Sequence, residues 1–206
     1  MSKRYWTSDI HFAHANIAKY CNRPTLLKGD LDENGKWITN DIALAAAVRM
    51  DTFLIRNLNS RIKKDDTVVH VGDYMNKGTV TKIPGLRNKP SFYTEQLNGT
   101  WIFLEGNHDG NIGVRTVARS MFVTIGPYRA FVAHYPIENE HIYHRDFIKY
   151  VTQNMDLQIT GHVHNIWKHK FYKGFLMYNV GVDAHRFLPI HDAEIINDVT
   201  KIIKEK

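Results

Sequence analysis

Five short apolar segments of this chain each lead into a side chain that can bind a metal ion, and this repeated arrangement restricts the fold more than any other feature. The segments are residues 4–8, 67–71, 101–104, 130–133 and 157–160. Longer stretches with helical spacing lie between them, an alternation typical of α/β folds. Because ligand sites of open α/β sheets lie beyond the carboxyl ends of the strands, we expect side chains from distant segments to meet at one sheet edge.

Two stretches show a helical pattern, and a third is loop-like. Residues 39–62 carry apolar side chains at helical spacing, with Thr39 or Asn40 available as the cap. Residues 192–203 predict an amphipathic helix, whereas residues 21–36 contain proline and glycine and predict a loop. We expect these helices to serve packing and not chemistry.

The composition is that of a globular domain. The chain has 206 residues, of which 43% are hydrophobic and 23% charged, so we expect a single domain over residues 1–206. No run of eighteen apolar residues occurs, and no apolar signal segment follows the first basic residues, so we expect a cytoplasmic protein without membrane contact. The single cysteine, Cys21, excludes an intramolecular disulfide.

The formal net charge of +6 favours anionic partners such as phosphate esters or nucleic acid. The positive charge is not concentrated, however, since Lys63 and Lys64 are followed at once by Asp65 and Asp66. We therefore interpret the charge as general solubility and weak steering in preference to a nucleic-acid footprint.

The residues that follow the apolar segments are carboxylates, imidazoles and one amide. They occur in the motifs Asp9-Ile10-His11, Gly72-Asp73, Gly106-Asn107-His108-Asp109, His134 and Gly161-His162-Val163-His164. Residues two apart in an extended segment share a face, so the Asp-x-His and His-x-His pairs can each offer two donors to one ion. Taken singly, each motif has an ordinary explanation as a cap, a turn or a surface histidine. The glycines would allow tight turns directly before the donors.

The four-residue motif at Gly106 is the most specific of the set. Asn107 offers a neutral carbonyl oxygen as a ligand. Asp109 could accept a hydrogen bond from one ring nitrogen of His108, which would leave the other ring nitrogen to donate a proton. We therefore expect His108 and Asp109 to be catalytic.

The whole motif series resembles the calcineurin-like metallophosphoesterases, and more narrowly a compact bacterial and phage branch of that superfamily. The resemblance covers nearly the whole chain. It is carried by the motifs above and by residues 7–12, 14–17, 23–24, 133–136 and 179–183.

This resemblance implies a fold and a set of residue roles. The fold is a four-layer αββα sandwich with a two-metal site at the sheet edge. The implied ligands are Asp9, His11 and His164 for the first ion, Asn107, His134 and His162 for the second, and Asp73 as the bridge. The resemblance also implies His108 as the general acid oriented by Asp109. The implied phosphate contacts are His14, Asn16, Arg23 and Asn107.

The expected reaction is hydrolysis of a phosphate monoester or diester, with a nucleotide or another small phosphoester as the partner. A hydroxide bridging the two ions would attack while His108 protonates the leaving group. Manganese is the expected metal, and iron, zinc and nickel suit the same donors. A nuclease with the same site is one alternative, since the charge would allow nucleic-acid binding and base stacking would be possible on aromatics at Tyr143, Phe147, Tyr150, Trp167 and Tyr172. A non-catalytic interaction module is the other, and the intact motif set argues against it.

Overall fold

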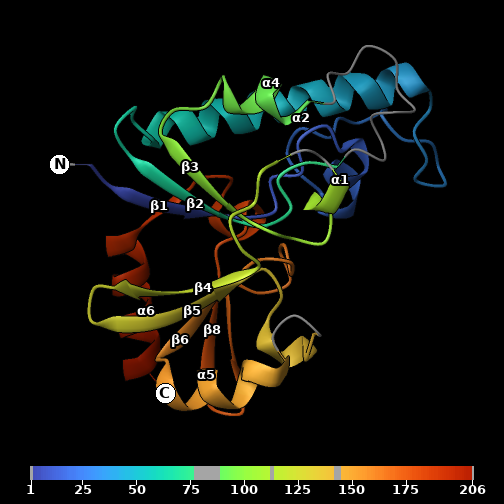
Figure 1. Ribbon diagram of the computed structural model, residues 1–206. Helices are drawn as coiled ribbons and strands as arrows, with labels where there is room; N and C mark the ends of the chain where they lie inside the picture. Colours follow the sequence, from blue (N-terminus) through green and yellow to red (C-terminus); the bar gives the residue numbers. More distant parts are fainter. Residues whose placement is uncertain (1, 77–88, 112–113, 142–144, 206) are drawn as a thin grey trace.

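The computed structural model describes residues 2–76, 89–111, 114–141 and 145–205. Two β-sheets lie face to face at the centre, with helices on their outer sides (Figure 1). From top to bottom in the figure, the layers are α2 with α4, the sheet containing β1–β3, the sheet containing β4–β8, and α5. The expected four-layer αββα architecture is therefore confirmed.

The first sheet has the strand order β3-β2-β1-β9. Strands β1 (Arg4–Thr7), β2 (Thr67–Val71) and β3 (Thr100–Leu104) are parallel, while β9 (Ile190–His191) runs antiparallel to β1. The parallel pairing aligns Tyr5 with Val68 and Val68 with Trp101. As a result, the carboxyl ends of the three strands reach the same edge of the sheet.

The second sheet has the strand order β4-β5-β6-β8-β7. Its three inner strands are parallel, namely β5 (Tyr128–Ala133), β6 (Leu157–Thr160) and β8 (Phe175–Asn179). The edge strands β4 (Ser120–Ile125) and β7 (His169–Tyr172) are antiparallel to their neighbours. This sheet also presents three carboxyl strand ends at one edge.

The main core lies between the two sheets, because alternate strand residues point inward. Trp6, Val69 and Leu104 from the first sheet pack in one buried cluster with Ile159 and Tyr178 from the second. Helix α6 (Asp192–Lys204) adds its apolar face, Ile195 and Val199, to the same cluster. This interior holds the two rows of carboxyl strand ends at fixed positions.

Two further cores attach the outer helices. Helices α1 (Ala15–Tyr20), α2 (Asn40–Arg61) and α4 (Pro90–Thr94) cover the other face of the first sheet, where Leu54 and Tyr93 are buried with Tyr5. Helix α5 (Ile148–Asn154) packs Val151 against Phe131 of the second sheet. Short 3₁₀ helices span Asp109–Asn111, Ile137–Asn139, Arg145–Phe147 and Val182–His185.

The structure confirms the five expected strands and both expected helices. Helix α2 begins after Thr39, whose hydroxyl accepts from the Ile42 backbone N–H at 3.2 Å, and α6 begins at Asp192 as expected. Strands β4, β7, β8 and β9 were not anticipated, and Tyr143 lies outside the described residues. Within the part of the chain that the structure describes, no helix combines the length and the apolar character needed to cross a bilayer.

Candidate metal centre

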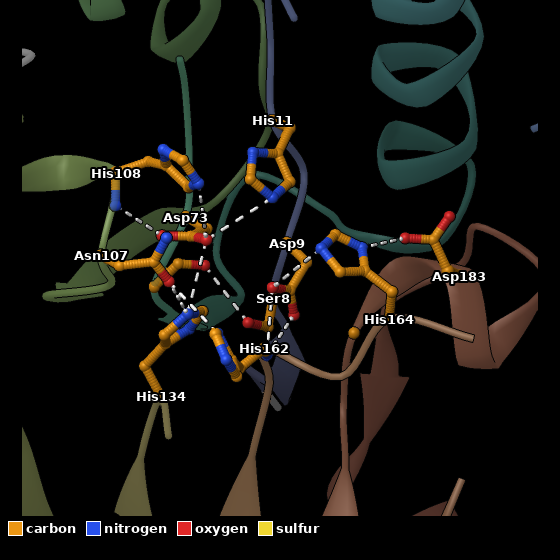
Figure 2. Close-up of polar contacts among 12 residues, drawn as sticks. Ser8, Asp9, His11, Asp73, Asn107, His108, His134, His162, His164 and Asp183 are labelled. Atoms are coloured by element: carbon orange, nitrogen blue, oxygen red, sulfur yellow. Dashed lines mark hydrogen bonds and ion pairs between the residues drawn. The ribbon is translucent and has the colours of Figure 1, made fainter. Parts of the chain in front are cut away.

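The predicted donors meet where the carboxyl ends of the two sheets face each other (Figure 2). Each donor lies in the loop that follows a strand, so the rigid core fixes where that loop begins. The strand and donor pairs are β1 with Asp9 and His11, β2 with Asp73, β3 with Asn107 and His108, β5 with His134, and β6 with His162 and His164.

The first predicted ligand group assembles at the end of β1. Donor atoms of Asp9, His11 and His164 all lie within 4.8 Å of one another. The His164 Nε2 atom is 3.9 Å from Asp9 Oδ1, and the His11 and His164 rings stack with centroids 5.1 Å apart. Asp9 is fully buried and His11 is 1% exposed. This spacing leaves room for one cation among the three side chains.

The second predicted group assembles beside the first, at the ends of β3, β5 and β6. The Asn107 side-chain oxygen lies 3.0 Å from His134 Nε2 and 3.2 Å from His162 Nδ1. The His134 Nδ1 atom lies 2.8 Å from the Val71 carbonyl oxygen. Since a carbonyl oxygen can only accept, Nδ1 is the donor in this contact, and Nε2 is directed into the site.

Asp73 lies between the two groups. Its Oδ2 atom is 3.5 Å from Nε2 of His11, a member of the first group, and 3.4 Å from Nε2 of His134, a member of the second. Its other oxygen, Oδ1, accepts the His108 backbone N–H at 2.9 Å. A carboxylate in this position can serve two ions at once.

The carboxylates raise the pKa of two nearby imidazoles although burial opposes it. Burial alone would lower the pKa of His134, but Asp73 outweighs it and raises the value to about 9. Burial also opposes protonation of His164, yet its hydrogen bond with Asp183 raises that pKa to about 10. The site therefore attracts positive charge, and a cation that binds there displaces protons.

The remaining ionisable groups respond mainly to burial. Burial lowers the pKa of His11 well below its ordinary value and that of His162 to about 4. Burial raises the pKa of Asp9. For Asp73 burial acts in the same direction, but the neighbouring His134 and His11 outweigh it and lower the pKa.

The residues at this site fit a pair of divalent cations. Both ring nitrogens of His11 are buried without a hydrogen-bond partner among the described residues, a costly state that a coordinated ion would relieve at one of the two nitrogens. Within the same described ranges, neither Asp9 nor Asp73 is ion-paired with a lysine or arginine. Carboxylate, amide and imidazole donors suit manganese, iron, zinc and nickel.

The backbone of this site is strained at the donors themselves. Five of them have a positive φ, namely Asp9 (57°), His11 (54°), Asp73 (60°), His162 (70°) and His164 (48°). Positive φ is uncommon for residues other than glycine, and a residue held in a sparsely populated backbone region costs on the order of 1–3 kcal/mol. Such a concentration of outliers indicates a site built for function.

The three glycines expected to form tight turns have two different roles. Gly72 has φ +88°, which agrees with that expectation. Gly106 and Gly161 have no positive φ and are needed for space instead. A Cβ on Gly161 would lie 2.6 Å from Asp9 Oδ2, and one on Gly106 would lie 2.9 Å from the Gly72 carbonyl carbon. The donor loops therefore pack directly against these glycine backbones.

The expected pairing of Asp109 with the His108 ring is not what the structure shows. The Asp109 carboxylate accepts the backbone N–H groups of Gly106, Asp73 and Tyr74 at 2.8, 2.7 and 3.0 Å. Asp109 thus joins the loops after β2 and β3. The His108 side chain is 39% exposed, with Nε2 4.0 Å from Asp73 Oδ2, and lies at the rim of the site.

Of the residues expected to contact phosphate, some lie at the site and others are engaged elsewhere in the protein. Arg23 is only 2% exposed and its guanidinium is paired with Asp183, so the structure gives no support to the predicted phosphate contact of this residue. The Asn16 side-chain oxygen accepts from Trp37 Nε1 at 2.7 Å and serves packing of the loop before α2. His14 does lie at the site, with its ring centroid 5.3 Å from that of His11. Burial lowers the pKa of His14 to about 4, so it is neutral at pH 7.

Asn179, the last residue of β8, and Asp183, which follows that strand, also belong to this site and were not among the predicted ones. The Asp183 carboxylate lies 2.8 Å from His164 Nδ1, on the side of the ring away from Asp9. The Asn179 side-chain amide donates to the His164 carbonyl oxygen at 2.8 Å. The sequence signal was present, because an apolar run again leads into Asn179 and Asp183.

Comparisons with known proteins agree with this fold and with this group of side chains. Residues 3–173 match the calcineurin-like phosphoesterase family. The uncharacterized protein MJ1445 of Methanocaldococcus jannaschii is 34% identical over 109 residues, which cover 53% of this chain and 48% of that protein. The chain thus matches about half the length of this relative. The solved structure of AQ665 from Aquifex aeolicus, a protein of unknown function, has 23% identity and a TM-score of 0.63, covering 96% of this chain and 99% of its own.

The AQ665 likeness supports the fold, and the family match spans most of the chain, including every predicted metal ligand but not the Asn179–Asp183 segment. Together with the assembled carboxylates and imidazoles, these observations lead to one assignment. The chain belongs to the calcineurin-like phosphoesterase family.

Proposed function

We propose that this protein is a dinuclear metal-dependent phosphoesterase that hydrolyses a phosphate monoester or diester, with a nucleotide or another small phosphoester as substrate. One observation carries the proposal. The Asp73 Oδ2 atom lies within 3.5 Å of imidazole nitrogens from both donor groups, His11 and His134, in a buried site without a lysine or arginine partner among the described residues. The narrower placement in a compact bacterial and phage branch stays a prediction.

Each ion would have its own set of ligands and one shared carboxylate. Asp9, His11 and His164 would hold the first ion, and Asn107, His134 and His162 the second, with Asp73 between them. When bound, two such ions supply Lewis-acid stabilisation of a phosphoryl oxygen and lower the pKa of water. We propose manganese as the metal, since the donors are oxygen and nitrogen atoms of intermediate softness.

We propose His108 as the proton donor. Its backbone N–H is fixed by Asp73 Oδ1 at 2.9 Å, while its ring reaches solvent at the rim. A ring held this way can give a proton to the leaving oxygen of a bound ester. General-acid catalysis of this kind contributes typically 10²–10⁴ in rate.

Two stacked rings beside the second ligand group, those of Tyr135 and His141, support a nucleotide substrate. The Tyr135 ring lies 4.7 Å from that of His162 and stacks on His141 with centroids 3.8 Å apart and an interplanar angle of 8°. Aromatic side chains at this position can line a planar base attached to the reacting phosphate.

The deciding experiment is a substrate panel with metal-free protein reloaded with manganese, iron, zinc or nickel. The panel contains nucleoside monophosphates, 2′,3′- and 3′,5′-cyclic nucleotides, cyclic and linear dinucleotides, and oligonucleotides. We expect metal-dependent turnover of at least one small phosphoester and none by Asp73→Ala. Preferred cleavage of oligonucleotides, with binding that weakens steeply with salt, would identify a nuclease instead. Absence of turnover with every metal would contradict the proposal and favour an interaction module.

A further inference from the structure

Arg23 is a buried cation that lies behind the first ligand group. Its guanidinium donates from Nε and Nη2 to the two Asp183 oxygens, each at 2.9 Å. The same guanidinium donates to the carbonyl oxygens of Ile10 at 2.9 Å and Asp9 at 2.8 Å. One side chain therefore connects the loop after β1 with the segment after β8.

Both of those segments control donors of the same ligand group. The loop after β1 carries Asp9 and His11, and its carbonyls are the ones that Arg23 fixes. The segment after β8 carries Asp183, whose carboxylate lies 2.8 Å from His164 Nδ1. A hydrogen bond at Nδ1 sets the tautomer and orientation of the ring, so that Nε2 faces Asp9.

We propose that Arg23 and Asp183 are positioning residues that assemble one of the two metal positions, the position of Asp9, His11 and His164, and leave the other largely unaffected. The inference rests on the proposed two-metal function. It assigns to Arg23 an internal role in place of a contact with substrate.

A second interpretation of the same atoms is a separate cation site. Donor atoms of Cys21, His164 and Asp183 also lie within 4.8 Å of one another. The Arg23 guanidinium already contacts both Asp183 oxygens, however, so a cation placed there would meet a buried positive charge at close range. Arg23 already neutralises the charge of Asp183, and the Asp183 carboxylate orients His164.

The effect should be selective because the second ligand group is held by other contacts. Asn107 lies between His134 and His162, and His134 is fixed by the Val71 carbonyl. Among the described residues, Arg23 has no hydrogen bond or ion pair with any of these side chains. Its influence reaches that group indirectly, for instance through the Asp9 carboxylate that accepts the His162 backbone N–H at 3.0 Å.

The test measures manganese binding in Arg23→Gln and Asp183→Asn, with Arg49→Gln as the matched control. Arg49 forms an ion pair with Asp30 at 2.6 Å in a neighbouring part of the chain and contacts no donor of either group. Calorimetric titration and metal analysis give the number of ions and their affinities. We expect the wild type and the control to bind two ions. In each variant, the affinity for one ion should fall about 10–100-fold, while the affinity for the other stays the same. Electron paramagnetic resonance should then change from a coupled manganese pair to an isolated ion.

The outcomes separate this inference from the proposed function. A wild-type protein that binds no manganese overturns the two-metal function and the inference with it. Two unchanged affinities in both variants overturn the inference alone, and so does an equal loss of both ions in folded Asp183→Asn. Circular dichroism checks that the variants fold. If Arg23→Gln does not fold, Asp183→Asn alone tests the inference, because asparagine keeps the shape of aspartate and one acceptor oxygen. Cys21→Ser should bind both ions normally, and loss of an ion there would support the separate cation site and overturn the orienting role of Asp183.

Discussion

Replacing Gly161 by alanine should destabilise the protein through one steric contact between two donor loops. The added Cβ would overlap the Ser8 hydroxyl and lie 2.6 Å from Asp9 Oδ2 and 2.8 Å from Ser8 Cβ. Ser8 is buried and donates to the Val71 carbonyl at 2.8 Å, so moving its hydroxyl away from the added Cβ would disturb this hydrogen bond. The clash must separate the β1 and β6 loops.

The size of the effect follows from the cost of overpacking a buried site. An extra methyl group in a well-packed interior costs typically about 1–3 kcal/mol. For a chain of this length, that corresponds to a decrease in Tm of roughly 2–12 °C. Displacement of the Asp9 carboxylate should also weaken the first metal position. Thermal and urea unfolding with a chelator present measure stability without the contribution of bound metal.

Gly110→Ala is the matched control. Its added Cβ would meet no atom within 4 Å, and Gly110 has no positive φ. We expect a change within about 0.5 kcal/mol for this surface substitution. Equal stability of the two alanine variants in the chelated state would refute the argument that close approach of the loops requires Gly161.

Three further outcomes are expected. His108→Ala should retain both ions but lose about 10²–10⁴ in rate on esters with poor leaving groups, and equal turnover would remove the general-acid role. Burial raises the pKa of Asp51 to about 7, above its usual value near 4, so the folded protein binds the extra proton between these values. The free energy of unfolding should therefore fall by about 4 kcal/mol relative to that of Asp51→Asn as the pH rises from about 4 to about 7. Urea unfolding at several pH values measures it, and an equal pH dependence in the two proteins would contradict this prediction. Dialysis against a chelator should lower Tm by roughly 5–11 °C for each ion that had been present at about 100 times its Kd, and Asp73→Ala should show a smaller shift.

The sequence alone predicted the strands that carry the donors because their signals are local. Each of these strands is a short apolar run, and each donor follows it within a few residues. The parallel arrangement then brings the strand ends together, as general rules for α/β sheets require. The edge strands β4 and β7 lack such a signal, since they are partly exposed and end in no donor motif.

The roles of charged and polar side chains were predicted less well, since their partners lie far along the chain. Arg23 and Asp183 are 160 residues apart, and Asp109 accepts from Asp73 and Tyr74 at separations of 36 and 35 residues. Motif position suggested a phosphate contact for Arg23 and a ring contact for Asp109. Burial and distance assign both of them to holding loops together.

The sequence by itself thus determined which residues can bind metal and the order in which they follow the strands, because residue chemistry and apolar pattern are properties of short segments. Only the tertiary structure decided that Asp73 lies between two donor groups, that Gly161 leaves space for Asp9, and that Arg23 faces inward. These features depend on distances between loops, and such distances are fixed only when the two sheets pack against each other.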